Sequence, residues 1–75
     1  SHEPICFSLL PQLFTLTPLQ NASEAISGKE IDKRNFRKRA KQSNVIEETK
    51  IIDKLTSKRG AVMYRYNGNE TDFRL

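Results

Sequence analysis

The chain has 75 residues, of which 36% are hydrophobic, so it forms one domain with a modest core and leaves little room for a buried catalytic cleft. Its single cysteine, Cys6, and its single histidine exclude an internal disulfide and a four-ligand zinc site, and the lone thiol fits a reducing cytoplasm. The net charge is +4, and no apolar run approaches the length of a membrane span. We therefore expect a cytoplasmic binding module that is not an enzyme and has no cofactor, metal site or membrane contact.

The first predicted element is a short helix within Pro4–Leu10, which Pro11 terminates. Its apolar residues also alternate, so a short strand is an open alternative. Leu13, Phe14 and Leu16 then form an apolar connector.

A second helix is predicted from Thr17 to Ser27. Thr17 is the expected N-cap, Pro18 occupies the first helical position, and Gln20 stands where a capping box has Glu or Gln. Gly28 supplies a left-handed residue that ends the helix. The residues expected to face inward are Leu19, Ala22 and Ile26.

A third helix, Asp32–Ser43, is predicted after a break of only four residues. Asp32 is the expected N-cap, and Ile31 and Phe36 are spaced for a hydrophobic staple. Asn44 is the expected C-terminal stop, because asparagine tolerates the left-handed conformation. Two helices joined by so tight a turn indicate a helix-turn-helix.

Two strands, Val45–Ile52 and Ala61–Asn67, follow and are rich in β-branched and aromatic residues. The polar loop Asp53–Gly60 joins them into a hairpin, which after a helix-turn-helix is a wing. Tyrosines on one face of the second strand are expected to pack in the core rather than to act as stacking platforms. The predicted fold is therefore an α+β winged helix-turn-helix with three helices and a two-stranded hairpin, formed by residues 4–67 and followed by a tail, 68–75.

Positive charge is concentrated in the third helix. From Lys29 to Lys41 there are seven basic residues and two acidic ones, whereas the rest of the chain is close to neutral. On a helical wheel, Phe36, Ala40 and Ser43 form the inward face. The opposite arc, about 100° wide, holds Arg34, Arg37, Lys38 and Lys41.

Such crowded like charges destabilise an isolated helix, and an external polyanion relieves the repulsion. Phosphates of double-stranded DNA do so, and arginine also recognises guanine edges in the major groove. The alternative for this feature is a solvated surface helix that happens to be basic.

Eight residues are predicted to contact DNA. Six lie in or at the edge of the third helix: Lys33, Arg34, Asn35, Arg37, Lys38 and Lys41. The other two, Lys58 and Arg59, lie in the hairpin loop and are expected to reach phosphates or an adjacent minor groove. For Asn35, simple surface polarity is an equally good explanation, and Arg39 is expected to flank the core.

The sequence also resembles a known family over most of its length. The likeness is carried by Phe14-Thr15-Leu16, Leu19-Gln20, Glu24-Ala25-Ile26, Gly28-Lys29, Asp32-Lys33-Arg34-Asn35-Phe36-Arg37-Lys38, Val45-Ile46-Glu47-Glu48-Thr49 and Tyr64-Arg65-Tyr66-Asn67. These segments resemble the C-terminal winged-helix DNA-binding domain of bacterial Nudix-related transcriptional regulators. The resemblance implies operator DNA as the partner, a homodimeric parent, and a preceding Nudix-like domain that binds a small-molecule effector.

No Nudix-box pattern occurs in these residues, so hydrolase activity and its metal site are not implied. A different class of function is left open by the sequence, namely a winged helix that docks an acidic protein partner. A third class, an enzyme fragment, has no nucleophile–base pair or metal cluster in its support.

Overall fold

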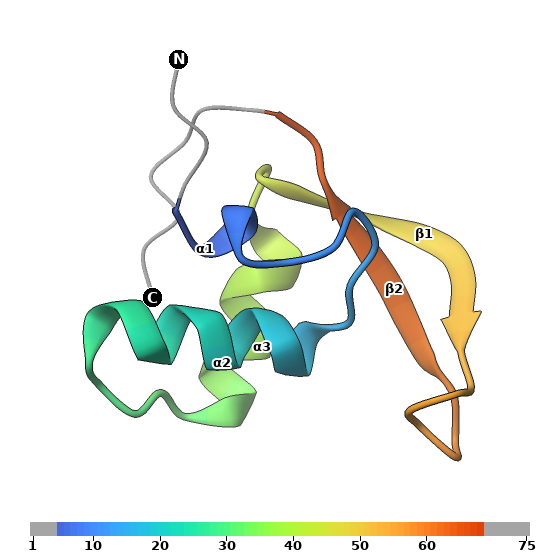
Figure 1. Cartoon of the computed structure of the whole chain (residues 1–75), viewed down its shortest axis with the longest axis horizontal. Coiled ribbons are helices and arrows are strands. Elements are labelled where there is room, and N and C mark those ends of the chain that lie inside the picture. The colour runs from blue at the N-terminus through green and yellow to red at the C-terminus, as the bar shows by residue number, and fades with distance from the viewer. Residues whose placement is uncertain (1–4, 69–75) are drawn as a thin grey trace.

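The computed structural model describes residues 5–68. Its elements, in chain order, are α1 (Ile5–Ser8), α2 (Leu16–Ser27), α3 (Lys33–Gln42), β1 (Ile46–Asp53) and β2 (Ala61–Tyr66). We call β1, β2 and the turn between them the wing, and residues 54–60 the wing turn. Figure 1 shows the wing extending away from the helices. Pro4 of the predicted domain and residues 69–75 of the predicted tail lie outside the described residues.

The first segment is helical, which confirms the predicted helix over the alternative strand, although α1 is a single turn of four residues. The connector after α1 pairs with β2: the Phe14 N–H donates to the carbonyl of Tyr64 at 3.0 Å, and the Tyr64 N–H donates back at 2.6 Å. The ring of Phe7 stacks on Tyr66, with centroids 4.7 Å apart. These contacts hold the N-terminal segment against the wing.

α2 begins earlier than predicted. Its N-cap is Thr15, not Thr17, and the Thr15 side chain makes no capping hydrogen bond. Pro18 is therefore the third helical residue, a place it tolerates because the first N–H groups of a helix have no intrahelical acceptor. The predicted capping box, with Gln20 returning to Thr17, is not formed.

The predicted inward face of α2 is confirmed at Leu19, which is buried, and at Ala22, which packs against the core, but not at its C-terminal end. The buried residues of α2 are Leu16, Leu19 and Ser23. Ile26, predicted to face inward, is 48% exposed. It points in the same direction as Leu19 but lies in the last turn, beyond the packed core. Gly28 ends the helix with a φ of 72°, which confirms the predicted left-handed C-terminus.

α3 is capped at its start as predicted, because the carboxylate of Asp32 accepts the N–H of Asn35 at 3.0 Å. The predicted stop at Asn44 is wrong. Ser43 leaves the helix in an extended conformation, and its N–H and hydroxyl both donate to the carbonyl of Ala40, at 3.2 and 2.8 Å. Serine satisfies the terminal carbonyl without a left-handed residue, and among residues 5–68 only glycines adopt positive φ.

The two strands form an antiparallel pair and match their predicted bounds to within one residue at each end. The register shifts within residues 49–51, which lie opposite Met63 alone. There the hydroxyl of Thr49 donates to the carbonyl of Met63 at 2.8 Å and accepts the N–H of Ile51 at 3.1 Å. This bulge bends β1 and leaves Ile51 and Ile52 exposed.

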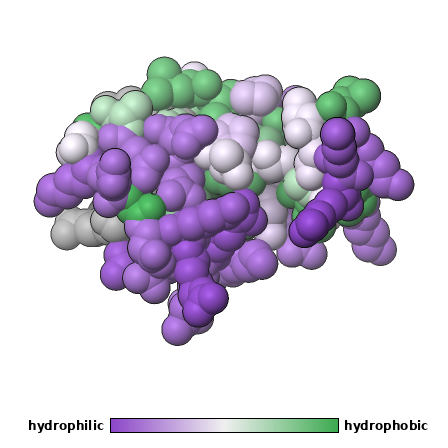
Figure 2. Space-filling view, turned by 90° about the horizontal axis from the view of Figure 1, so that it is seen from below, coloured by the Kyte–Doolittle hydropathy of each residue, from purple (hydrophilic) through white to green (hydrophobic). Residues whose placement is uncertain are grey.

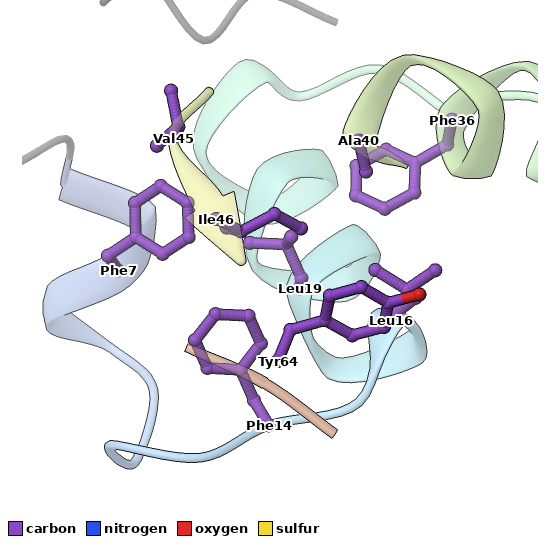
Figure 3. Packing of buried hydrophobic residues seen from close by; sticks show 9 residues of the cluster. All are labelled: Phe7, Phe14, Leu16, Leu19, Phe36, Ala40, Val45, Ile46 and Tyr64. Carbon is purple, nitrogen blue, oxygen red and sulfur yellow. The ribbon is translucent and has the colours of Figure 1, made fainter. Parts of the chain in front are cut away.

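The core joins the helices to the wing (Figure 3). Its buried members are Phe7, Phe14, Leu16, Leu19, Phe36, Ala40, Val45, Ile46 and Tyr64. Phe36, Leu19 and Val45 are completely buried. Phe36 and Ala40 confirm the predicted inward face of α3, and Tyr64 confirms that the tyrosine face of β2 packs in the core. The opposite face of α3 is thereby directed to solvent.

Candidate nucleic-acid interface

The turn between α2 and α3 is fixed by two side chains of α2 that bind the same residue. The amide of Gln20 donates to the carbonyl of Ile31 at 2.8 Å, and the carboxylate of Glu24 accepts the N–H of Ile31 at 2.7 Å. Both backbone groups of this turn residue are therefore satisfied by α2. These bonds hold the start of α3 in a defined position relative to α2.

The outer side of α3 carries a continuous strip of cations. Lys33, Arg34, Arg37, Lys38 and Lys41 line one shallow depression on this face. All but Arg37 are exposed, and none of the five forms a salt bridge with another residue in the part of the chain that the structure describes. In the view from below, hydrophilic side chains gather over α3 and again over the wing, with a paler band between them (Figure 2).

That paler band corresponds to a groove between α3 and the wing. On the α3 side the groove is lined by Lys33, Arg37 and Lys41. On the wing side it is lined by Thr56, Ser57, Arg59 and Gly60. Its floor consists of Thr15, Leu16, Thr17 and Pro18 at the start of α2 and of Ala61, Val62 and Tyr64 on β2. The tertiary structure thus places a cation of the wing turn opposite those of α3.

Arg37 differs from the other cations of the strip because it is half-buried and tied to α2. Its guanidinium donates to the hydroxyl of Thr17 at 3.2 Å, which links the two helices. Its Nε atom is buried and has no hydrogen-bond partner among the described residues. Arg37 is therefore a half-buried part of the groove wall, whereas Arg34 and Lys38 are exposed and do not line the groove.

Behind the groove, the hydroxyl of Tyr64 donates to the carboxylate of Glu48 at 3.3 Å. Burial raises the pKa of Tyr64 above 10.0, the nearby negative charge of Glu48 adds to this, and the positive charge of Arg37 opposes it. Tyr64 is accordingly a neutral phenol that supports the groove floor and carries no charge of its own.

The wing turn is organised by one carboxylate. Asp53 accepts the N–H of Leu55 at 2.9 Å, the N–H of Thr56 at 3.3 Å, and the hydroxyl of Thr56. Its pKa is held below 3.8, first by the Thr56 hydroxyl and then by the two N–H groups. These bonds fix the backbone at the tip of the turn.

The end of the wing turn requires a glycine. Gly60 has a φ of 82°, and a Cβ atom there would lie 2.8 Å from the side chain of Ile52. Its N–H donates to the carbonyl of Ser57 at 3.1 Å. This tight closure directs the neighbouring Arg59 toward the groove wall.

Comparison with known proteins agrees with this geometry. A family model described as the NrtR DNA-binding winged helix domain matches residues 6–66. The chain belongs to this NrtR winged-helix family. It is also 47% identical over 66 residues to an ADPR responsive transcriptional repressor, NtrR, of Acinetobacter baylyi. That alignment covers 88% of this chain but 26% of the relative, so the chain spans about a quarter of the relative's length.

Six of the eight predicted contact residues line the two adjoining depressions: Lys33, Arg34, Arg37, Lys38, Lys41 and Arg59. Asn35 does not join them, because it lies in a separate depression beside Lys29 and Arg39. Lys58 is exposed on the wing turn but does not line the groove. DNA contacts by all eight residues remain predictions.

Sequence reasoning missed the contribution of α2 to the groove. Thr15, Thr17 and Pro18 at the start of α2 form part of the floor. The sequence predicts only a capping role for Thr17, whereas in the structure its hydroxyl accepts a hydrogen bond from Arg37. The helix-turn-helix arrangement itself carried this signal, because it sets the start of the first helix near the outer face of the second.

No group of three or more metal-ligating side chains occurs among residues 5–68. No helix in the same range has the length and apolarity needed to cross a membrane.

Proposed function

We propose that this NrtR winged-helix domain binds double-stranded operator DNA sequence-specifically, with the predicted recognition helix Asp32–Ser43, which contains α3, in the major groove. The observation that carries the proposal is the groove in which Arg59 of the wing faces Lys33, Arg37 and Lys41 of α3. A single basic helix fits many anions. Cations on two facing walls above a neutral floor suit a sugar-phosphate strand that runs between them.

The first turn of α2 supports the same placement. Thr15 caps α2 without a side-chain hydrogen bond, so its side chain does not occupy the N–H groups of the first turn. Helix N-termini attract phosphates through such N–H groups and through the helix dipole. Together with Arg37, which Thr17 holds in place, this end of α2 suits contact with the phosphate strand and fixes the register of α3 on the duplex.

Arg34 and Lys38 are assigned a different role. They are exposed, and they line the outer depression but not the groove beside the wing. With the phosphate strand in the groove, these two side chains face the base edges of the major groove, where arginine binds guanine through two hydrogen bonds. Lys58 is proposed to reach a phosphate beside the wing turn, and Asn35 a phosphate at the start of α3.

The parent protein is proposed to be a bacterial, cytoplasmic transcriptional regulator. The relative from Acinetobacter baylyi is named as a repressor that responds to ADPR. We infer that the rest of the parent binds a small-molecule effector of this kind and forms a homodimer. Two copies of α3 would then contact half-sites about one helical turn apart. In this role the domain is not an enzyme.

The test separates phosphate contacts from base contacts. Duplexes bound by the chain are selected from a random library, and affinity for the selected duplex is measured by fluorescence anisotropy over a range of salt concentrations. The double variant Lys33→Ala/Lys41→Ala is expected to reduce the slope of log affinity against log salt concentration by about 2, since each phosphate contact contributes about 0.9 to that slope. The double variant Arg34→Ala/Lys38→Ala is expected instead to lose discrimination between the selected duplex and a scrambled one.

The matched control is Lys50→Ala/Arg65→Ala, which removes the same charge from two exposed positions on the strands of the wing, in a depression that holds none of the eight predicted contact residues. It should retain the salt slope and the discrimination of the parent chain. Binding that is independent of salt, or control losses as large as those of the groove variants, would show that the interface is not this one. Capture of an acidic peptide with no affinity for any duplex would replace the proposal with protein docking.

A further inference from the structure

The tip of the wing turn presents an apolar side chain entirely to solvent. Leu55 is 98% exposed, more than any other large hydrophobic side chain in the described range. Its backbone is nevertheless fixed, because Asp53 accepts the N–H groups of both Leu55 and the next residue, Thr56. The wing turn therefore presents an exposed leucine on a fixed backbone, and no contact within residues 5–68 explains why an apolar side chain is placed there.

The surroundings of Leu55 are cationic and continuous with the proposed interface. Thr56 and Arg59, on the same turn, line the groove that faces α3. Lys54 and Lys58, on either side of the tip, are exposed. An apolar side chain framed by cations suits a polyanion that also offers apolar surface, and duplex DNA offers its sugars and base edges in the grooves.

The groove between α3 and the wing fixes which part of the duplex Leu55 meets. If one sugar-phosphate strand lies between α3 and the wing, α3 occupies the major groove on one side of that strand. The minor groove lies on the other side, where the wing turn stands. We propose that Leu55 enters this minor groove and gives the domain a preference for A·T pairs there. The inference rests on the proposed function and extends it to a specificity residue in the wing.

The preference follows from what each base pair presents in the minor groove. A·T and T·A pairs present only acceptors, whereas a G·C pair adds the exocyclic N2 amino group of guanine. A leucine pressed against that group displaces its water and offers no acceptor in return. The unsatisfied donor penalises G·C pairs, while the flat floor of an A·T pair accepts the methyl groups.

Inosine gives a direct test. In the selected duplex, each A·T pair flanking the footprint of α3 is replaced by G·C or by I·C, which has the major groove of G·C but lacks the N2 amino group. The parent chain is expected to bind the G·C duplex about tenfold more weakly and to regain most of that loss with I·C. Leu55→Ser is expected to bind the selected duplex about tenfold more weakly and to show less than about twofold preference among the three duplexes.

The control is Leu9→Ser, the same change at a leucine that is 61% exposed and directly follows α1. Figure 1 shows α1 far from the wing turn. Because Leu55 has almost no contacts to lose, its variant should keep the thermal midpoint of the parent chain. If Leu55→Ser retains both affinity and the A·T preference while Arg34→Ala/Lys38→Ala loses discrimination, the leucine inference is wrong and the proposed function stands. If no variant of α3 affects binding, the proposed function itself fails.

Discussion

Replacing Phe36 with alanine tests how the recognition face of α3 is oriented. Phe36 is completely buried and, with Ala40, is the part of α3 that joins the core. Everything proposed for the outer strip of cations requires this ring to point inward. The informative comparison is Ile26→Ala, because the sequence predicted that Ile26 is also inward, whereas the structure leaves it 48% exposed.

The expected cost of Phe36→Ala is about 3–5 kcal/mol, the usual range for deleting a buried aromatic ring, since the cavity adds to the lost transfer free energy. A chain of 75 residues has a total stability of about 4–11 kcal/mol. The variant should therefore lose a large share of its stability. Its thermal midpoint should fall by at least about 12 °C, because each kcal/mol shifts a domain of this size by about 4–8 °C.

Ile26→Ala should cost about 1 kcal/mol or less, because half of the side chain is already in water and alanine has the higher helix propensity. Both variants are compared with the parent chain by thermal unfolding followed by circular dichroism, and urea unfolding supplies the free energies. An Ile26 variant as unstable as the Phe36 variant would restore the sequence-predicted face of α2. A Phe36 variant that melts within about 5 °C of the parent chain would refute the inward placement of the ring, and with it the geometry of the interface.

Three further predictions concern single groups. Asp32→Ala should destabilise the domain by about 1 kcal/mol because it removes the N-cap of α3, and an unchanged urea midpoint would contradict the cap. The Thr56 hydroxyl, followed by two N–H groups, holds the pKa of Asp53 below its unfolded value of 3.8. The ionised carboxylate therefore stabilises the wing turn fully above pH 3.8, and this stabilisation is lost as pH falls through the lowered pKa. A pH titration followed by the NMR amide signals of Leu55 and Thr56 should show this loss. Burial raises the pKa of Tyr64 above 10.0, so the stability associated with its neutral phenol is full below pH 10.0 and is lost as pH rises through the raised pKa. Phenolate absorbance should show a late ionisation that Tyr64→Phe removes.

Much of the fold was predictable because its signals are local. The cap at Asp32, the glycine after α2 and the alternating residues of the two strands act through neighbours within a few positions. The inward position of Phe36 and the outward position of Arg34 follow from helical periodicity alone. These features were predicted correctly for that reason.

The errors have equally definite physical causes. Ile26 lies on the same face of α2 as the buried Leu19, but it lies beyond the end of the core. Helical periodicity indicates only the face on which a residue lies and not whether the core extends that far. The N-cap moved to Thr15 because a proline is acceptable anywhere in the first turn of a helix, so Pro18 did not fix the start. The stop at Asn44 failed because Ser43 satisfies the carbonyl of Ala40 without a left-handed residue.

The sequence by itself determined that a capped, basic helix has one apolar face and one cationic face, because both properties repeat with the period of the helix. Only the tertiary structure decided which other groups share the cationic face. Arg59 reaches the groove through a hairpin that the Thr49 bulge bends and Gly60 closes, and Thr17 reaches it through the packing of α2. These contacts depend on how segments that are distant in the sequence pack around Phe36 and Tyr64. Thr17 and Arg37, for example, are 20 residues apart, and no short-range sequence pattern encodes the distance between two such residues.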